Sequence, residues 1–236
     1  MHRALVTGGT RGIGRAIAKA LLAGGARVLI TGRDDAGVDA AVRELGAETG
    51  DAARVAGLAA DVRRRADVEA ALAEAVRRFG GLDVVVNNAG VGAFGPVESM
   101  SDDDWHRVID TNVTGPFLVT RAAIPLLRAG GGGWIINVAS LAGRNAFPDG
   151  AAYCASKSAL VAFSESVMQE VRHDDIRVSV IMPGSVSTSF SGRHRDDDGW
   201  KLTGDDVAEV VIDLLRHPKR SLPSKVEIRP SRPKKG

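Results

Sequence analysis

A glycine-rich turn near the start of the chain constrains the fold more strongly than any other sequence feature. The apolar run from Arg3 to Thr7 predicts a short buried strand, and a helical pattern follows from about Gly12 to Ala23. We expect Gly8 to permit a tight turn, Gly12 to allow close approach of a ligand, and Gly14 to let helix and strand pack closely. Strand, turn and helix N-terminus together can bind a pyrophosphate, although the spacing Gly-x-x-x-Gly-x-Gly also fits an ordinary strand-to-helix turn.

Strand-like runs recur along the chain and alternate with helical patterns. We expect the further strands at residues 27–31, 55–59, 82–86, 134–138, 176–181 and 226–228. This alternation predicts an α/β fold of the Rossmann type, in which a doubly wound parallel sheet of seven strands carries helices on both faces. No linker-like stretch divides the chain. We therefore expect a single domain over residues 1–236, with a segment covering the pocket at about 189–202 and a basic tail at about 230–236.

One long helix is expected from Ser101 to about Arg128, with bends at Pro116 and Pro125. Asn112 lies in its interior, where asparagine has a low helix propensity. A buried polar role would explain an asparagine at this position.

Composition limits the classes of function. The net charge is +2, with basic and acidic residues interleaved, so nothing favours binding to nucleic acid. The single cysteine, Cys154, cannot form an internal disulfide, and no base lies at local spacing from it, so we assign it to packing. No apolar run reaches a membrane-spanning length and the start does not look like a signal peptide. We expect a cytoplasmic protein with no membrane contact and no metal site.

The end of the second strand bears on nucleotide preference. An acidic residue about 20 residues past the glycines would hold the ribose 2′-hydroxyl of NAD, but Arg33 occupies this region. Arg33 and Arg11 suit a 2′-phosphate, so we predict NADP(H) rather than NAD(H). Asp34 could instead pair with Arg33, approach the ribose, or cap the next helix.

Asp61, which follows the third strand, could accept a hydrogen bond from the adenine amino group or cap the helix around residues 67–79.

The only tyrosine of the chain, Tyr153, precedes Lys157 by four residues in a helical pattern from about residue 151 to residue 172. Residues at this spacing lie on the same face of a helix, one turn apart. A nearby ammonium favours the phenolate, so we expect Lys157 to lower the tyrosine pKa from about 10 toward neutrality. Alternatively, Tyr153 is packed and Lys157 is solvated on an ordinary amphipathic helix. Ser140 ends the fifth strand, where ligands bind in such sheets.

The order and spacing of these motifs resemble the short-chain dehydrogenase/reductase family from Arg3 to about Ile228. In particular, the chain is similar to NADP-dependent 3-oxoacyl-(acyl carrier protein) reductases and related carbonyl reductases. The residues that carry the resemblance are Thr7-Gly8-x-x-x-Gly12-Ile13-Gly14, Asp61, Asn87-Asn88-Ala89-Gly90, Asn112, Ser140, Tyr153-x-x-x-Lys157 and Pro183-Gly184-x-Val186-x-Thr188.

The resemblance implies a role for each catalytic residue. Tyr153 would protonate the carbonyl oxygen, and Lys157 would lower its pKa and bind the nicotinamide ribose. Ser140 would donate a hydrogen bond to the reacting oxygen, and Asn112 would support a water in a proton relay. The implied cofactor-binding residues are Gly8, Thr10, Arg11, Gly12, Ile13, Gly14, Arg33, Asp61, Val62, Asn88, Ala89, Gly90, Tyr153, Lys157, Pro183, Gly184, Val186 and Thr188.

We therefore predict an NADP(H)-dependent oxidoreductase that interconverts a carbonyl and a secondary alcohol on a small molecule, as a homodimer or homotetramer. A 3-oxoacyl-(acyl carrier protein) reductase is a narrower alternative. However, the segment after Thr188 is short for that group, and the chain ends in Lys225–Pro230 instead of a glycine-rich ending. A non-catalytic nucleotide sensor on the same fold is a second alternative, and an epimerase or dehydratase is a third.

Overall fold

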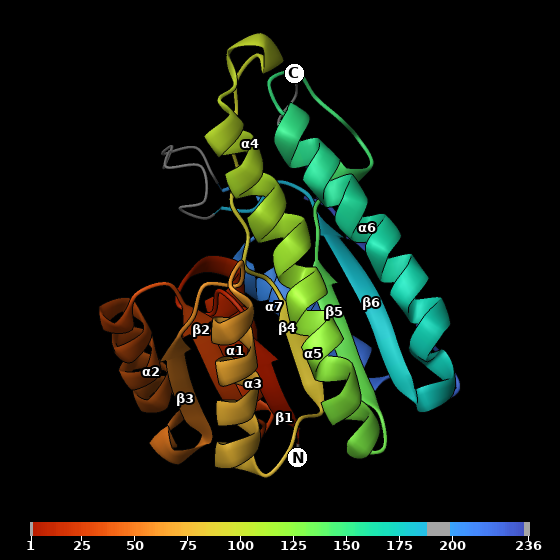
Figure 1. The fold of residues 1–236 in the computed structure, drawn as a ribbon. Helices are drawn as coiled ribbons and strands as arrows, with labels where there is room; N and C mark the ends of the chain where they lie inside the picture. The colour runs from red at the N-terminus through yellow and green to blue at the C-terminus, as the bar shows by residue number, and fades with distance from the viewer. Residues whose placement is uncertain (1, 188–198, 234–236) are drawn as a thin grey trace.

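The computed structural model describes residues 2–187 and 199–233, and Figure 1 shows their arrangement. The strands in this part of the chain are β1 (Arg3–Val6), β2 (Arg27–Gly32), β3 (Val55–Ala59), β4 (Val84–Asn87), β5 (Gly133–Val138), β6 (Ile176–Pro183) and β7 (Lys225–Ile228). They form a parallel seven-stranded sheet in the order β3-β2-β1-β4-β5-β6-β7. The predicted Rossmann-type sheet is confirmed.

Helices cover both faces of this sheet, as predicted. They are α1 (Gly12–Ala23), α2 (Asp35–Thr49), α3 (Arg65–Phe79), α4 (Asp102–Ile109), α5 (Gly115–Ala129), α6 (Ala151–Val171) and α7 (Gly204–Arg216). Apolar residues of α1, α2 and α7 pack on one face, and those of α3, α5 and α6 pack on the other. In Figure 1, α5 and α6 lie in front of the sheet and α7 behind it. None of the helices in the described residues is long and apolar enough to cross a membrane.

The sheet reverses its winding between β1 and β4. After β3 the chain returns to the other side of β1, where Val6 pairs in parallel register with Val86. At the amino ends of these strands, the Arg3 guanidinium donates to both carboxylate oxygens of Asp83, at 2.8 and 2.5 Å. The segments that follow β1 and β4 therefore begin side by side at the carboxyl edge, where ligands bind in open parallel sheets.

The helix expected from Ser101 to Arg128 is divided in two. A π-helical turn over Asp110–Thr114 separates α4 from α5, so the break lies before Pro116 rather than at it. Pro116 instead occupies the first turn of α5, where its missing N–H leaves no hydrogen bond unmade. Asn112 lies within the π turn and is fully buried, as its poor helix propensity suggested.

The boundary predicted for the fourth strand differs from the structure, and the segment predicted at about 189–202 lies mostly outside the described residues. The fourth strand begins at Val84 rather than Leu82 and extends to Asn87. Of the segment predicted to cover the pocket, residues 189–198 lie outside the described part of the chain. Its last residue, Leu202, pairs with Val186, and the Ser187 N–H donates to the Leu202 carbonyl at 2.7 Å.

Buried side-chain amides connect the central strands to α5 and α6. The Nδ2 group of Asn87 donates to Asn137 Oδ1 at 2.8 Å and to Thr120 Oγ1 at 3.2 Å. On β5, the Nδ2 group of Asn137 donates to Ser164 Oγ at 2.8 Å. This network fixes the end of β4 against β5 immediately before the loop that starts at Asn88. Polar groups with no access to water stabilise a fold only when they are paired in this way.

We expect Asn137→Ala to lower the free energy of unfolding by about 2 to 3 kcal/mol, because it removes two buried hydrogen bonds and leaves a small cavity. Urea denaturation followed by circular dichroism measures this change. Asn145→Ala, which truncates an exposed asparagine, is the matched control and should change stability by less than about 0.5 kcal/mol. A loss for Asn137→Ala as small as that of the control would contradict a structural role for the network.

Candidate active site

A cavity of about 600 Å³ opens at the carboxyl edge of the sheet, where the chain reverses its winding. Three of the four predicted catalytic residues, Ser140, Tyr153 and Lys157, line this cavity. The predicted cofactor-binding residues along its wall are Gly8, Thr10, Arg11, Gly12, Ile13, Arg33, Asp61, Val62, Asn88, Ala89, Gly90, Tyr153, Lys157, Pro183, Gly184 and Val186. Gly14 is buried beneath the wall, and Thr188 lies outside the described residues.

The glycine turn forms the floor of the cavity by direct contact with the loop after β4. Asn88 donates from Nδ2 to the carbonyls of Thr7 and Gly8, both at 3.0 Å. Gly8 has φ +64°, and a Cβ atom on it would lie 2.9 Å from Ala89 Cα. A Cβ atom on Gly14 would lie 2.3 Å from Asn88 Nδ2, so no other residue type fits there. The side chain of Asn88 therefore joins the ends of two strands.

Lys157 lies on α6, and its side chain is buried where it lines the cavity. It is 5% exposed, and its Nζ donates to the Val138 carbonyl at 3.0 Å. The absence of a side chain at Gly90 keeps space open beside it, since a Cβ atom there would lie 3.6 Å from the ammonium nitrogen. Burial lowers the pKa of Lys157 from its ordinary 10.5 to about 8.

Asn112 lies behind Lys157 and does not line the cavity. Its Oδ1 accepts from the Val91 N–H at 2.9 Å, and its Nδ2 donates to the Val91 carbonyl and to Ser156 Oγ, both at 2.9 Å. The amide thus joins the π turn to the β4 loop and to α6. Both of its N–H donors are used by protein atoms.

Tyr153 does not have the lowered pKa that its spacing from Lys157 suggested. Burial raises the pKa of the phenol above 10, and a hydrogen bond with the Ser140 side chain acts against this rise. The Lys157 Nζ lies 5.8 Å from the centre of the tyrosine ring and donates to the Val138 carbonyl. The expected direction is therefore wrong for this structure, because desolvation outweighs the distant charge.

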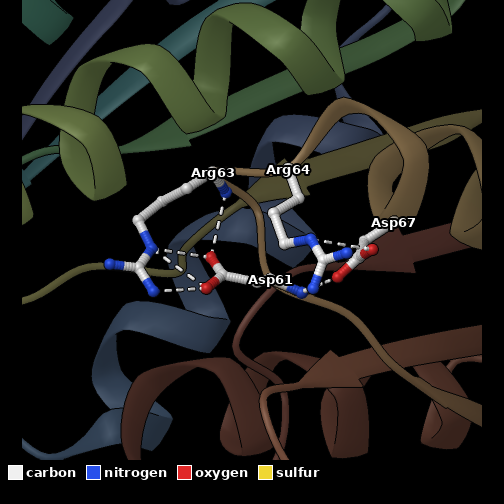
Figure 2. A network of polar contacts seen from close by, with 4 residues as sticks. All are labelled: Asp61, Arg63, Arg64 and Asp67. Carbon is white, nitrogen blue, oxygen red and sulfur yellow. Dashed lines mark hydrogen bonds and ion pairs between the residues drawn. The ribbon is translucent and has the colours of Figure 1, made fainter.

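At the far end of the cavity, Asp61 is held by an arginine (Figure 2). Arg63 Nε and its Nη2 group donate to the Asp61 carboxylate at 2.5–3.0 Å, and this pairing lowers the pKa of Asp61, with a smaller contribution from Arg33. The proposal that Asp61 caps the next helix is wrong, because the N-cap position is occupied by Arg64. Asp67 from that helix instead accepts from the Asp61 N–H at 3.0 Å.

The structure also defines the role of Asp34, the acid that follows Arg33. Asp34 caps α2, with its carboxylate accepting from the Gly37 N–H at 2.8 Å. It is therefore used in local structure rather than in an ion pair with Arg33. Arg11 and Arg33 both line the cavity and form no ion pair with any residue that the structure describes.

Three basic residues of the cavity wall were missed in the sequence, namely Arg63, Arg107 and Lys201. The sequence could have indicated Arg63 as a residue of the cavity wall, because it lies two residues after Asp61 in the same loop at the end of a strand. Arg107 and Lys201 had no such signal, because each is brought to the wall by distant elements. Within residues 2–187 and 199–233, no cluster of histidine, cysteine, aspartate and glutamate could hold a metal ion.

The chain is similar to proteins of known class over nearly its full length. An uncharacterized oxidoreductase of Staphylococcus aureus strain MRSA252 is 30% identical over 227 residues, which cover 96% of each protein. The solved structure of a metagenomic short-chain oxidoreductase in complex with NADP is 38% identical with a TM-score of 0.84, covering 98% of this chain and 97% of the other. An alcohol dehydrogenase from the archaeon Thermococcus sibiricus, complexed with 5-hydroxy-NADP, is 31% identical with a TM-score of 0.89 over 98% of both chains.

The family model described as short chain dehydrogenase matches residues 2–199, which include the glycine turn, the β4 loop and the Tyr153 helix. Fold, sequence and relatives thus agree over the same segments, and the chain belongs to the short-chain dehydrogenase family of oxidoreductases.

Proposed function

We propose that this chain is an NADP(H)-dependent oxidoreductase that interconverts a carbonyl and a secondary alcohol by hydride transfer. The observation that carries this proposal is the meeting of Ser140, Tyr153 and Lys157 at one cavity that also contains the glycine turn and Arg33. The cavity fits a dinucleotide, because the turn exposes backbone where side chains are excluded and Arg11, Arg33 and Arg63 line the wall. The bound nicotinamide would supply the hydride; the protein supplies position and protons.

Tyr153 is the proton donor in this proposal. With a pKa above 10, the phenol is protonated at neutral pH, and it would give its proton to the carbonyl oxygen during reduction. The Ser140 hydroxyl, already hydrogen-bonded to the phenol, would hold the same oxygen. Lys157 would stabilise the phenolate that forms and, with a pKa of about 8, would be the group that returns a proton.

Asn112 acts in this scheme by position. Its side-chain amide is used by Val91 and Ser156, so it does not itself bind a relay water through Nδ2. Instead, it holds the π turn against α6 beside the buried ammonium.

Preference for NADP(H) rests on Arg11 and Arg33. Both guanidinium groups face the cavity without an ionic partner among the described residues, and Asp34 is occupied at the helix cap. A phosphate on the ribose would give them charge-assisted hydrogen bonds. The NADP complex of the metagenomic relative and the 5-hydroxy-NADP complex of the archaeal relative support the same choice.

The proposal also covers the oligomeric state of the protein and its cellular compartment. We propose that the chain is a single domain that works in the cytoplasm as a homodimer or homotetramer on a small-molecule substrate. Light scattering of the purified protein measures the oligomeric state directly.

We expect Tyr153→Phe to lower kcat/KM for ketone reduction by about 10² to 10⁴, because the proton donor is lost. NADPH binding, measured by the fluorescence of the nicotinamide, should be retained. Cys154→Ala changes the next residue on α6, which does not line the cavity, and should leave kcat/KM nearly unchanged. Near-normal turnover of Tyr153→Phe would refute the assigned proton donor and leave the cofactor site untouched.

Arg33→Ala should weaken NADPH binding roughly tenfold to a hundredfold and NADH binding far less, because only NADPH carries the 2′-phosphate. Isothermal titration with both nucleotides gives the two dissociation constants. Arg43→Ala removes an exposed arginine from α2 outside the cavity and serves as the matched control. Equal losses for NADPH and NADH would show that Arg33 does not read the phosphate.

The buried ammonium predicts a dependence of stability on pH. The folded state holds the Lys157 proton more weakly than the unfolded chain, so its contribution to stability increases as the pH rises from about 8 toward 10.5. Relative to Lys157→Met, the wild-type protein should gain about 2 kcal/mol between pH 7.5 and pH 9.5 in urea unfolding. Lys19→Met on the surface of α1 controls for loss of a lysine. A constant difference between wild type and Lys157→Met would contradict the burial of this charge.

A further inference from the structure

Two phenylalanines, which do not line the 600 Å³ cavity, continue from Tyr153 as a series of ring contacts. Phe94, in the loop after β4, is 51% exposed, and Phe147, in the loop after β5, is 44% exposed. The ring centroid of Phe94 lies 5.5 Å from that of Tyr153, with the planes tilted by 56°. The Phe147 centroid lies 6.3 Å from that of Phe94, with the planes 27° apart. We call Phe94, Phe147 and Tyr153 the aromatic row.

Backbone contacts hold the two loops of the aromatic row together. The Gly95 N–H donates to the Asp149 carbonyl at 2.8 Å, although the two residues are far apart in sequence. Asp149 has φ +62°, which is uncommon for a residue other than glycine. Gly150 provides a bare backbone surface for the ring of Phe147, since a Cβ atom there would lie 2.5 Å from Phe147 Cε2. The backbone contacts therefore fix the loops that carry Phe94 and Phe147, although both rings remain partly exposed to water.

The two stretches that carry the phenylalanines offer no ionic partner to a charged substrate group. Residues 91–97 and 145–148 contain no charged side chain. Arg144, at the edge of the second loop, is paired with Glu227 at 2.5 Å. A carboxylate or phosphate near the reacting carbon would find no ionic partner in these two stretches. An apolar group would cover ring surface that is otherwise in contact with water.

Resting on the proposed function, we propose that the substrate is a carbonyl compound that carries an aryl group next to the carbonyl carbon. With its oxygen at Tyr153 and Ser140, such a molecule places its ring against Phe94 and Phe147. Aromatic rings pack favourably in tilted or offset arrangements with centroids about 4.5 to 7 Å apart, the spacing that the row already shows. A small alkyl group gains only part of this contact.

The test compares kcat/KM for 1-phenylethanone and butan-2-one with NADPH, using the full chain. The wild-type protein should favour the aryl ketone more than tenfold. Phe94→Ala and Phe147→Ala should each reduce that ratio by roughly two- to tenfold, and Phe94→Tyr, which keeps a ring, should preserve it. Phe117→Ala removes a phenylalanine of similar exposure from α5 and should leave the ratio unchanged.

Both exposed side chains can be truncated without opening the core, and circular dichroism checks that each variant is folded. If butan-2-one is reduced as well as 1-phenylethanone, or if neither alanine variant changes the ratio, the aryl assignment is overturned while the proposed reaction stands. If NADPH binds but neither ketone oxidises it, the proposed function fails, and the aryl assignment fails with it.

Discussion

The site depends on the contact between the glycine turn and the loop after β4. Parallel pairing of Val6 with Val86 brings the two segments together, and the Asn88 amide then joins them through the carbonyls of Thr7 and Gly8. The approach is so close that a single methyl group on Gly14 would collide with Asn88. Every other part of the cavity is arranged around this floor. Arg33 and Asp61 reach the cavity wall from the ends of β2 and β3, and Ser140 and Tyr153 reach it from the end of β5 and from α6.

The proton chemistry follows from burial more than from the spacing of two residues on a helix. Desolvation raises the pKa of Tyr153 and lowers that of Lys157, so the two groups move in opposite directions from similar starting values. In this structure the ammonium, rather than the phenol, is the acid that titrates near physiological pH. Burial therefore favours the protonated form of Tyr153 and the neutral form of Lys157.

Much of the fold was predictable because its signals are local and periodic. The boundaries of α1 and β3 agree with the sequence pattern residue for residue, and the strand alternation alone predicted a parallel sheet. The order of the motifs also predicted most of the cofactor-binding residues that line the cavity.

The errors share one cause, since each depended on a side-chain contact or on burial that periodicity does not report. The π turn around Asn112 reflects hydrogen bonds to Val91 and Ser156, which no helical pattern encodes. The pairing of Asp61 with Arg63 required side-chain geometry, and the pKa of Tyr153 required knowledge of its burial. Periodicity reports which face of an element is apolar, but it carries no information about such partners.

The pairing of β1 with β4 also has a consequence for how the chain reaches its folded state. Arg3 and Asp83, which join these strands, are 80 residues apart, and Asn88 is 81 residues from Thr7. Contacts of this separation close late, because a long loop must lose its freedom before they form. A nascent chain that contains only the first three strands therefore has the glycine turn without the β4 loop that completes the floor of the cavity. The floor of the cavity is complete only when β4 has been synthesised and has paired with β1.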